Sequence, residues 1–281
     1  MSDKLQTLRG VLGRLDSALL AYSGGVDSTF VLRVASEELG NRLVALTVRS
    51  PTAADEEFAD AAKMAAECSV EHVIVDSNEL MIPGYADNPT NRCYFCKANL
   101  FEICHAEASH RGISTILDGA NLDDLGDYRP GLQAAGKHRI RHPLVEAELT
   151  KDEIRAFSRQ LGLPTWDKPA SPCLSSRFPY GTKITPERLE QVRSAEALLH
   201  GLGFRACRVR YHQQIARIEV PVGELANLLA DETRLRLVEG LKALGFLYVT
   251  VDLQGLRSGS LNEALSQTRA DSAPKPDLPA S

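Results

Sequence analysis

Short apolar runs alternate with segments of helical periodicity through the first half of the chain. The apolar runs predict strands at residues 18–22, 43–48, 72–75 and 114–117. Between the strands, the spacing of apolar positions predicts helices at residues 27–39, 55–68 and 97–110. Strands that alternate with helices form a parallel sheet with helices on both faces. We therefore expect a doubly wound, Rossmann-like α/β fold, which binds ligands beyond the carboxyl ends of its strands.

The pattern changes after the first domain, which we place at residues 1–164. Residues 165–184 are rich in Pro, Gly, Ser and Thr without a clear period, and we expect an active-site loop or linker there. Helix and strand patterns return at residues 185–265 and predict a smaller α+β domain for substrate binding or oligomerisation. Residues 266–281 have the composition of a disordered tail.

The overall composition is that of a globular protein. Of the 281 residues, 43% are hydrophobic and 25% are charged, with a formal net charge of −5. No stretch approaches the roughly 18 apolar residues of a membrane span, and the first residues lack the apolar run of a secretory signal. We expect a cytoplasmic protein with no membrane partner. The acidic pI of about 5.8 argues against general nucleic-acid binding.

A Ser-Gly-Gly-Val-Asp-Ser segment that begins at Ser23 lies between the first predicted strand and the first predicted helix. Backbone N–H groups and the helix dipole form an anion site at such a junction. Gly24 and Gly25 let the backbone approach phosphates, and the hydroxyls of Ser23 and Ser28 can donate to them. Without a Walker-type lysine, the segment is better suited to bind pyrophosphate as it leaves. Asp27 is expected to cap the helix and to help hold Mg²⁺. A tight turn without a ligand is the alternative.

Arg208 and Arg210 alternate along a predicted strand and project from the same face. Two guanidinium groups suit a phosphate, so an anionic mononucleotide would fit as substrate. Ser176 and Arg177 in the long loop are further candidates for substrate contacts. In the alternative, the arginines pair with carboxylates on a solvated surface, those of Glu196, Glu219 and Glu224.

Several segments together resemble the LarE family within the PP-loop ATP pyrophosphatases. They are SGGVDS at residue 23, DGAN at 118, DYRPG at 127, SSRFPYG at 175, RVRYH at 208 and IARIE at 215. The resemblance implies an enzyme that adenylylates a carboxylate of pyridinium-3,5-biscarboxylic acid mononucleotide with ATP. The enzyme then converts the carboxylate to a thiocarboxylate in nickel-pincer cofactor biosynthesis. SGGVDS alone indicates only the superfamily, so an aminating ligase, a tRNA thiolase and a nucleotide-sensing module remain alternatives.

The resemblance also implies residue roles. The residues that would contact the phosphates, the metal or the adenosine are Ser23, Gly24, Gly25, Asp27, Ser28, Thr47, Ser50 and Gly119. Family members assemble, so we expect a homo-oligomer.

Cys93 and Cys96 form a C-x-x-C pair, and Cys173 lies in the long loop. This set is similar to the form of the family in which three thiolates hold a 4Fe–4S cluster. Three cysteines leave one iron without a protein ligand, where sulfur from a sulfide or persulfide source could bind. The spacing alone does not separate this site from a structural zinc completed by Cys104 or His105. Direct sulfur donation by Cys173 and plain buried thiols also remain open.

Overall fold

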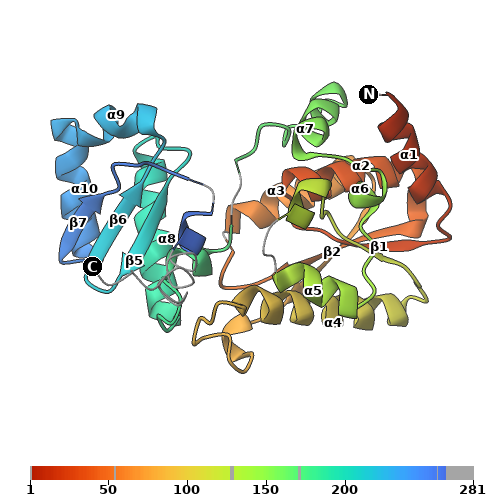
Figure 1. Ribbon diagram of the computed structural model, residues 1–281, viewed down its shortest axis with the longest axis horizontal. Coiled ribbons are helices and arrows are strands. Elements are labelled where there is room, and N and C mark those ends of the chain that lie inside the picture. The colour runs from red at the N-terminus through yellow and green to blue at the C-terminus, as the bar shows by residue number, and fades with distance from the viewer. Residues whose placement is uncertain (1, 54, 127–129, 170–171, 258, 264–281) are drawn as a thin grey trace, which may run out of the picture. The chain divides into compact units, whose positions relative to one another are not determined.

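The computed structural model describes residues 2–53, 55–126, 130–169, 172–257 and 259–263 (Figure 1). Contacts divide the chain into two compact units. The first contains Met1–Leu174 and Tyr180–Pro186, and the second contains Ser175–Pro179 and Glu187–Ser281. The expected tail at 266–281 lies outside the described residues, as do residues 127–129 of the DYRPG segment and residues 170–171 before Cys173.

The first unit is built on a parallel sheet with the strand order β3-β2-β1-β4. Its strands are β1 (Ala18–Ala21), β2 (Leu43–Arg49), β3 (Glu71–Asp76) and β4 (Ile116–Leu117). In the register, Leu19 of the central strand β1 lies between Val44 of β2 and Ile116 of β4. All residues of β1 are buried, as expected for a strand covered on both faces. The predicted doubly wound α/β fold is confirmed.

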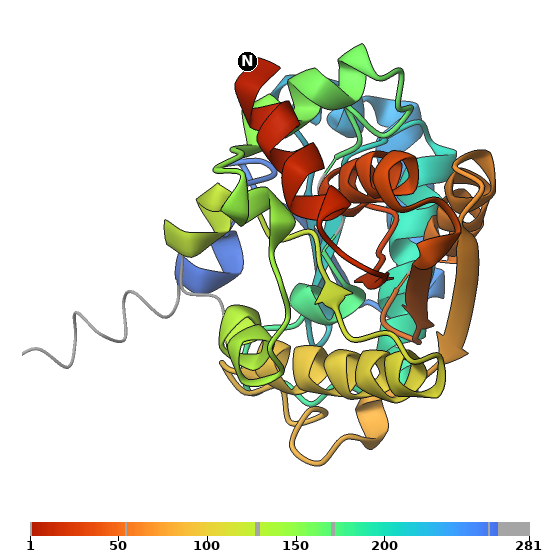
Figure 2. The same ribbon diagram turned by 90° about the vertical axis from the view of Figure 1, so that its right-hand side faces the viewer.

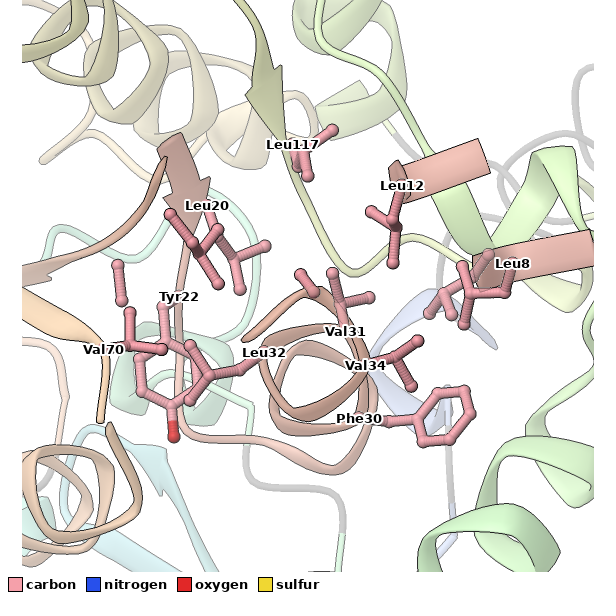
Figure 3. Close-up of a cluster of buried hydrophobic side chains, with 14 of the residues drawn as sticks. Leu8, Leu12, Leu20, Tyr22, Phe30, Val31, Leu32, Val34, Val70 and Leu117 are labelled. Carbon is pink, nitrogen blue, oxygen red and sulfur yellow. The ribbon is translucent and has the colours of Figure 1, made fainter. Parts of the chain in front are cut away.

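Helices cover both faces of this sheet (Figures 1 and 2). One face carries α1 (Ser2–Gly13), α2 (Val26–Leu39), α3 (Asp55–Glu67), α6 (Pro143–Glu146) and α7 (Lys151–Gln160). Their apolar side chains enclose Leu20 and Leu117 of the sheet (Figure 3), and the rings of Phe30 and Phe157 stack with centroids 6.1 Å apart. The other face carries α4 (Arg92–His110) and α5 (Pro130–Lys137), which lie side by side.

Helix α4 begins at Arg92 and not at residue 97 as predicted. The C-x-x-C pair therefore lies among the first five residues of the helix rather than before it. Tyr94, between the two cysteines, packs against the core formed by α4, α5 and the sheet. This packing stabilises a helical first turn in a segment whose cysteines and aromatic residues show no clear period.

The second unit contains a mixed sheet with the order β5-β6-β7. Its elements are α8 (Pro186–Gly201), β5 (Arg208–His212), β6 (Ile215–Glu219), α9 (Leu225–Leu229), α10 (Asp231–Ala243) and β7 (Tyr248–Val251). Strands β5 and β6 are antiparallel, and β6 and β7 are parallel. Val209 and Ile218 are almost fully buried in the sheet, as are Leu237 and Leu241 on α10. The unit therefore has an apolar core of its own.

Short 3₁₀ turns complete the described chain: η1 (Gly40–Arg42), η2 (Glu79–Met81), η3 (Leu122–Gly126), η4 (Leu174–Arg177), η5 (Val222–Glu224) and η6 (Ser260–Asn262). Among the helices of the described ranges, none combines the length and the apolar composition that crossing a lipid bilayer requires.

Candidate nucleotide and sulfur-transfer site

The glycine-rich segment joins β1 to α2 at the carboxyl end of the central strand. Gly24 has a φ of 69°, a left-handed conformation that favours glycine, and Gly25 is the N-cap of α2. Gly25 has no side chain that could accept a hydrogen bond from the first turn of α2, and the described chain shows no capping hydrogen bond there. The first backbone N–H groups of α2 therefore stay available for a ligand. The hydroxyl oxygens of Ser23 and Ser28 lie 3.0 Å apart. The loop therefore offers backbone and hydroxyl donors to an anion.

Gly119, which follows β4, lies directly against this loop. A Cβ atom at Gly119 would lie 2.8 Å from the backbone nitrogen and 3.0 Å from the Cα atom of Ser28. The preceding Asp118 accepts hydrogen bonds from Nδ1 of His142 at 2.6 Å and from the backbone nitrogen of Ala120 at 3.0 Å. The hydrogen bond from His142 raises the pKa of that imidazole. The structure thus brings the DGAN turn and the phosphate loop together.

Asp27 lies in the first turn of α2 and is paired with a lysine. Its Oδ2 atom is 2.5 Å from Nζ of Lys151, the first residue of α7, while its Oδ1 atom is buried without a hydrogen-bond partner in the described chain. A second lysine, Lys168, reaches the backbone oxygen of Gly24 at 3.5 Å. Sequence reasoning missed both lysines. A signal that could have placed Lys151 at the start of α7 is the capping box formed by Thr150 and Glu153.

Thr47 and Ser50, at the end of β2, have partners within the first unit. The Thr47 hydroxyl donates to the backbone oxygen of Tyr22 at 2.8 Å and lies 2.8 Å from Nε2 of His72, whose pKa burial lowers. The Ser50 hydroxyl lies 2.9 Å from that of Thr52. Thr47 is buried, so in this arrangement it supports the end of the strand.

The three candidate sulfur ligands lie in one region of the first unit. Cys93 and Cys96 are one turn apart on α4, and the residue after Cys173 donates its backbone N–H to the oxygen of Thr52 at 2.8 Å. Burial raises the pKa of Cys96 to about 12, and Cys173 acts in the same direction. The pKa of Cys93 is raised too, first by desolvation of its sulfur and then by Cys173. The thiols are thus near enough to influence one another.

The side chains of this region include a buried carboxyl group. Glu79 is 5% exposed, and its Oε1 atom accepts a hydrogen bond from Sγ of Cys96 at 3.9 Å. Burial raises the pKa of Glu79. As the side chains stand in the described part of the chain, no three His, Cys, Asp or Glu residues form a group that could hold a metal ion.

The zinc alternative requires Cys104 or His105 to join the pair. An α-helix rises about 1.5 Å per residue, so both lie roughly 12 Å or more along α4 from Cys96. Cys104 is fully buried in the core under α5, and Nε2 of His105 lies 2.8 Å from the backbone oxygen of His138. These two residues therefore do not complete a site with the C-x-x-C pair.

In the second unit, two arginines have carboxylate partners. Arg210 forms two hydrogen bonds with Glu219, at 3.0 and 2.9 Å, and Arg177 forms two with Glu196, at 2.8 and 2.9 Å. All four side chains are buried. Arg210 thus has one of the carboxylate partners that the alternative named, but the pair is buried and not on a solvated surface. The Arg177–Glu196 pair was not predicted.

Arg208 has a different environment from its neighbours. Its guanidinium donates to the backbone oxygen of Arg257 at 3.1 Å, and in the described residues it forms no ion pair. Burial and the nearby charges of Arg210 and Arg177 lower the pKa of Arg208. A buried cation next to other cations is a suitable place for an anionic ligand.

Comparisons with known proteins agree with this geometry. Residues 18–87, which include the phosphate loop, match the family Asparagine synthase. A pyridinium-3,5-bisthiocarboxylic acid mononucleotide synthase from Lactiplantibacillus plantarum is 37% identical over 270 residues, 96% of this chain and 97% of that protein. An uncharacterized protein from Synechocystis sp. is 48% identical over 95% of this chain and 100% of its own length. A glutamine-hydrolyzing GMP synthase from Aeropyrum pernix is 28% identical over 65% of this chain and 39% of its own length.

The parallel sheet with SGGVDS at the end of its central strand defines a PP-loop ATP pyrophosphatase fold. Similarity over nearly the whole length to the Lactiplantibacillus synthase is more specific than the fold. The chain belongs to the LarE family. The expected class of enzyme, an ATP-dependent sulfurtransferase, is confirmed by this membership.

Proposed function

We propose that the protein adenylylates a carboxylate of pyridinium-3,5-biscarboxylic acid mononucleotide and converts it to a thiocarboxylate in nickel-pincer cofactor biosynthesis. The observation that carries this proposal is the match over 96% of the chain to the synthase of Lactiplantibacillus plantarum. The phosphate loop of the first unit supports it, because the first N–H groups of α2 are free to bind phosphates.

The chemistry explains why ATP is needed. A carboxylate is a poor electrophile because its leaving group would be an oxide. When its oxygen attacks the α-phosphorus, the bond to the β-phosphate breaks and pyrophosphate leaves with the electron pair. A sulfur nucleophile then attacks the carbonyl carbon of the acyl adenylate, and AMP departs. In this scheme Ser23, Gly24, Gly25 and Ser28 bind the phosphates.

Asp27 would hold Mg²⁺, as its residue type and place allow. Its Oδ1 atom is buried and has no hydrogen-bond partner in the described chain, and carboxylate oxygens are the ligands that Mg²⁺ prefers. Thr47, Ser50 and Gly119 would border the nucleotide. In the second unit, Arg208 would bind the substrate phosphate, with Ser176, Arg177 and Arg210 next to it.

Cys93, Cys96 and Cys173 would hold a 4Fe–4S cluster, whose chemistry is to present a bound sulfide at the iron that lacks a protein ligand. The donor set fits in kind, and Cys173 influences the pKa of each thiol of the pair, which supports the proposal. As the side chains stand in the described residues the three sulfur atoms do not form a metal-binding group, so ligation would require their side chains to turn. The raised pKa values of Cys93 and Cys96 mean that these two thiols carry protons when no metal is bound, so their ligation must release protons. We propose sulfide or a persulfide as the sulfur source.

Analysis of anaerobically purified protein tests this assignment. We expect about four irons and four acid-labile sulfides per chain, and pyrophosphate release only with the pyridinium substrate. Cys93→Ser, Cys96→Ser and Cys173→Ser should each lose iron, whereas Cys68→Ser, outside the trio, should keep it. Two results together would instead indicate an aminating ligase, the activity class of the more distant GMP synthase relatives. The wild type would contain no iron, and Cys93→Ser would retain full activity with ammonia.

Self-assembly through the second unit is a further part of the proposal. Large apolar side chains are exposed there, with Tyr248 57% and Leu253 78% accessible. Exposed apolar residues of this size favour contact with another chain. Light scattering on the purified protein measures the mass directly, and a monomer at all concentrations would contradict a homo-oligomer.

A further inference from the structure

The phosphate loop carries a negative charge of its own. Asp27 lies in its first helical turn, where phosphates would add further negative charge. The ammonium group of Lys151 lies 2.5 Å from the Asp27 carboxylate, so this lysine compensates the charge of the loop itself. Lys151 is therefore engaged by Asp27, and the charge of the β- and γ-phosphates beyond what Mg²⁺ neutralises would be stabilised by a further cation near the loop.

Lys168 is placed to supply that cation. Its Nζ atom lies 3.5 Å from the backbone oxygen of Gly24 in the loop and 3.5 Å from Oδ2 of Asp60 on α3. Both contacts are long, and the Asp60 side chain is 68% exposed, so the pair is screened by solvent and contributes little stability. The ammonium group can turn to a stronger anion at small cost.

The backbone that carries Lys168 is fixed to the first unit. Two N–H groups of Arg155 on α7 donate to the backbone oxygens of Trp166, at 2.6 Å, and Lys168, at 2.9 Å. The guanidinium of Arg159, on the same helix, lies 5.0 Å from the centre of the Trp166 ring. Lys168 is therefore held beside the loop by a dedicated set of contacts rather than being a freely moving surface lysine.

We propose that Lys168 binds the β- and γ-phosphates of ATP and the pyrophosphate product. It would do the work of the lysine that the SGGVDS segment lacks, from a position far along the chain. As the bond between the α- and β-phosphates breaks, its electron pair passes to an oxygen of pyrophosphate, and an ammonium group at that place stabilises the growing charge. The inference rests on the proposed function, in which pyrophosphate is a product.

Two ligands that differ in the relevant phosphates test this role. Binding of inorganic pyrophosphate and of AMP, each with Mg²⁺, is measured by calorimetry for the wild type and for Lys168→Met. Losing a charge-assisted hydrogen bond should weaken pyrophosphate binding about tenfold. AMP lacks the β- and γ-phosphates, so its affinity should not change. Lys63→Met, at an exposed lysine of α3, is the matched control and should bind both ligands as the wild type does.

Lys168→Arg is the second variant, which shows whether a loss of binding in Lys168→Met comes from the lost charge or from a folding defect. It keeps the charge and should retain most of the pyrophosphate affinity. Unchanged pyrophosphate binding in Lys168→Met would overturn the inference, as would an equal loss of AMP and pyrophosphate binding. The outcome is separable from the proposed function. A wild type that makes the thiocarboxylate while Lys168→Met binds pyrophosphate normally refutes only the role of Lys168. A selective loss of pyrophosphate binding in an enzyme that makes no thiocarboxylate refutes only the proposed function.

Discussion

Replacing Gly119 with alanine should weaken nucleotide binding by displacing Ser28 of the phosphate loop, although it removes no group that bonds to the nucleotide. The added methyl group would lie 2.8 Å from the nitrogen, 3.0 Å from Cα and 3.2 Å from Cβ of Ser28. These are mostly backbone atoms in the first turn of α2, so no side-chain rotation relieves the clash. Overpacking of this kind costs about 1–3 kcal/mol. If the loop moves to relieve it, the affinity for ATP should fall about 5- to 100-fold, since 1.4 kcal/mol corresponds to tenfold.

Calorimetric titration of Gly119→Ala with AMP and ATP, together with thermal unfolding, measures this effect. Gly136→Ala on α5 is the control, because a Cβ there meets nothing within 4 Å. Alanine is the better helix former by about 1 kcal/mol, so the control should unfold at the same or a higher temperature and bind nucleotide normally. If Gly119→Ala binds ATP like the wild type and unfolds at the same temperature, the close approach of the two turns does not constrain the site.

Two further predictions concern buried charges and thiols. Glu219→Ala leaves the buried Arg210 guanidinium uncompensated and should cost about 3–5 kcal/mol in urea unfolding; a loss below about 1 kcal/mol would show that water reaches this pair. Burial raises the pKa of Cys104 to about 12, so the folded state holds this proton more tightly than the unfolded state, whose pKa is about 9. That contribution to stability is complete below pH 9 and is lost as the pH rises toward about 12, so Cys104→Ala should show a shallower fall of the unfolding temperature over this window. Parallel curves would contradict a protonated, buried Cys104.

The sequence was sufficient for the parallel sheet and the phosphate loop because both depend on local pattern. Each strand of the first unit reads as a short apolar run, and SGGVDS is contiguous. Lys151 and Lys168 escaped prediction because they reach the loop from positions more than a hundred residues away in sequence. The sequence around Gly24 contains no signal that indicates these two lysines as neighbours. Helix α4 was predicted to begin too late because its first turn depends on packing of Tyr94 against the core, which periodicity does not reveal.

The two arginines of β5 show what the alternation of side chains along a strand can and cannot predict. Alternation correctly predicts that Arg208 and Arg210 share a face, but it does not decide which of them has a carboxylate partner. Arg210 holds Glu219 and also donates to the backbone oxygen of Ser176 at 2.7 Å. Turning it toward a phosphate would leave a carboxylate that is almost fully buried without its main partner, which is costly.

Arg208 forms no ion pair in the described part of the second unit. Its pKa is lowered first by burial and then by the charges of Arg210 and Arg177, which Glu219 and Glu196 offset in part. An anion that binds there removes the cost of burying this charge, whereas an anion on Arg210 would have to displace Glu219. Under the proposed function the substrate phosphate is therefore assigned to Arg208, while Arg210 keeps Glu219 and holds the backbone of Ser176 in place. The family resemblance implies substrate contacts for both arginines. The buried carboxylate of Glu219 distinguishes them, because it pairs with Arg210 and not with Arg208.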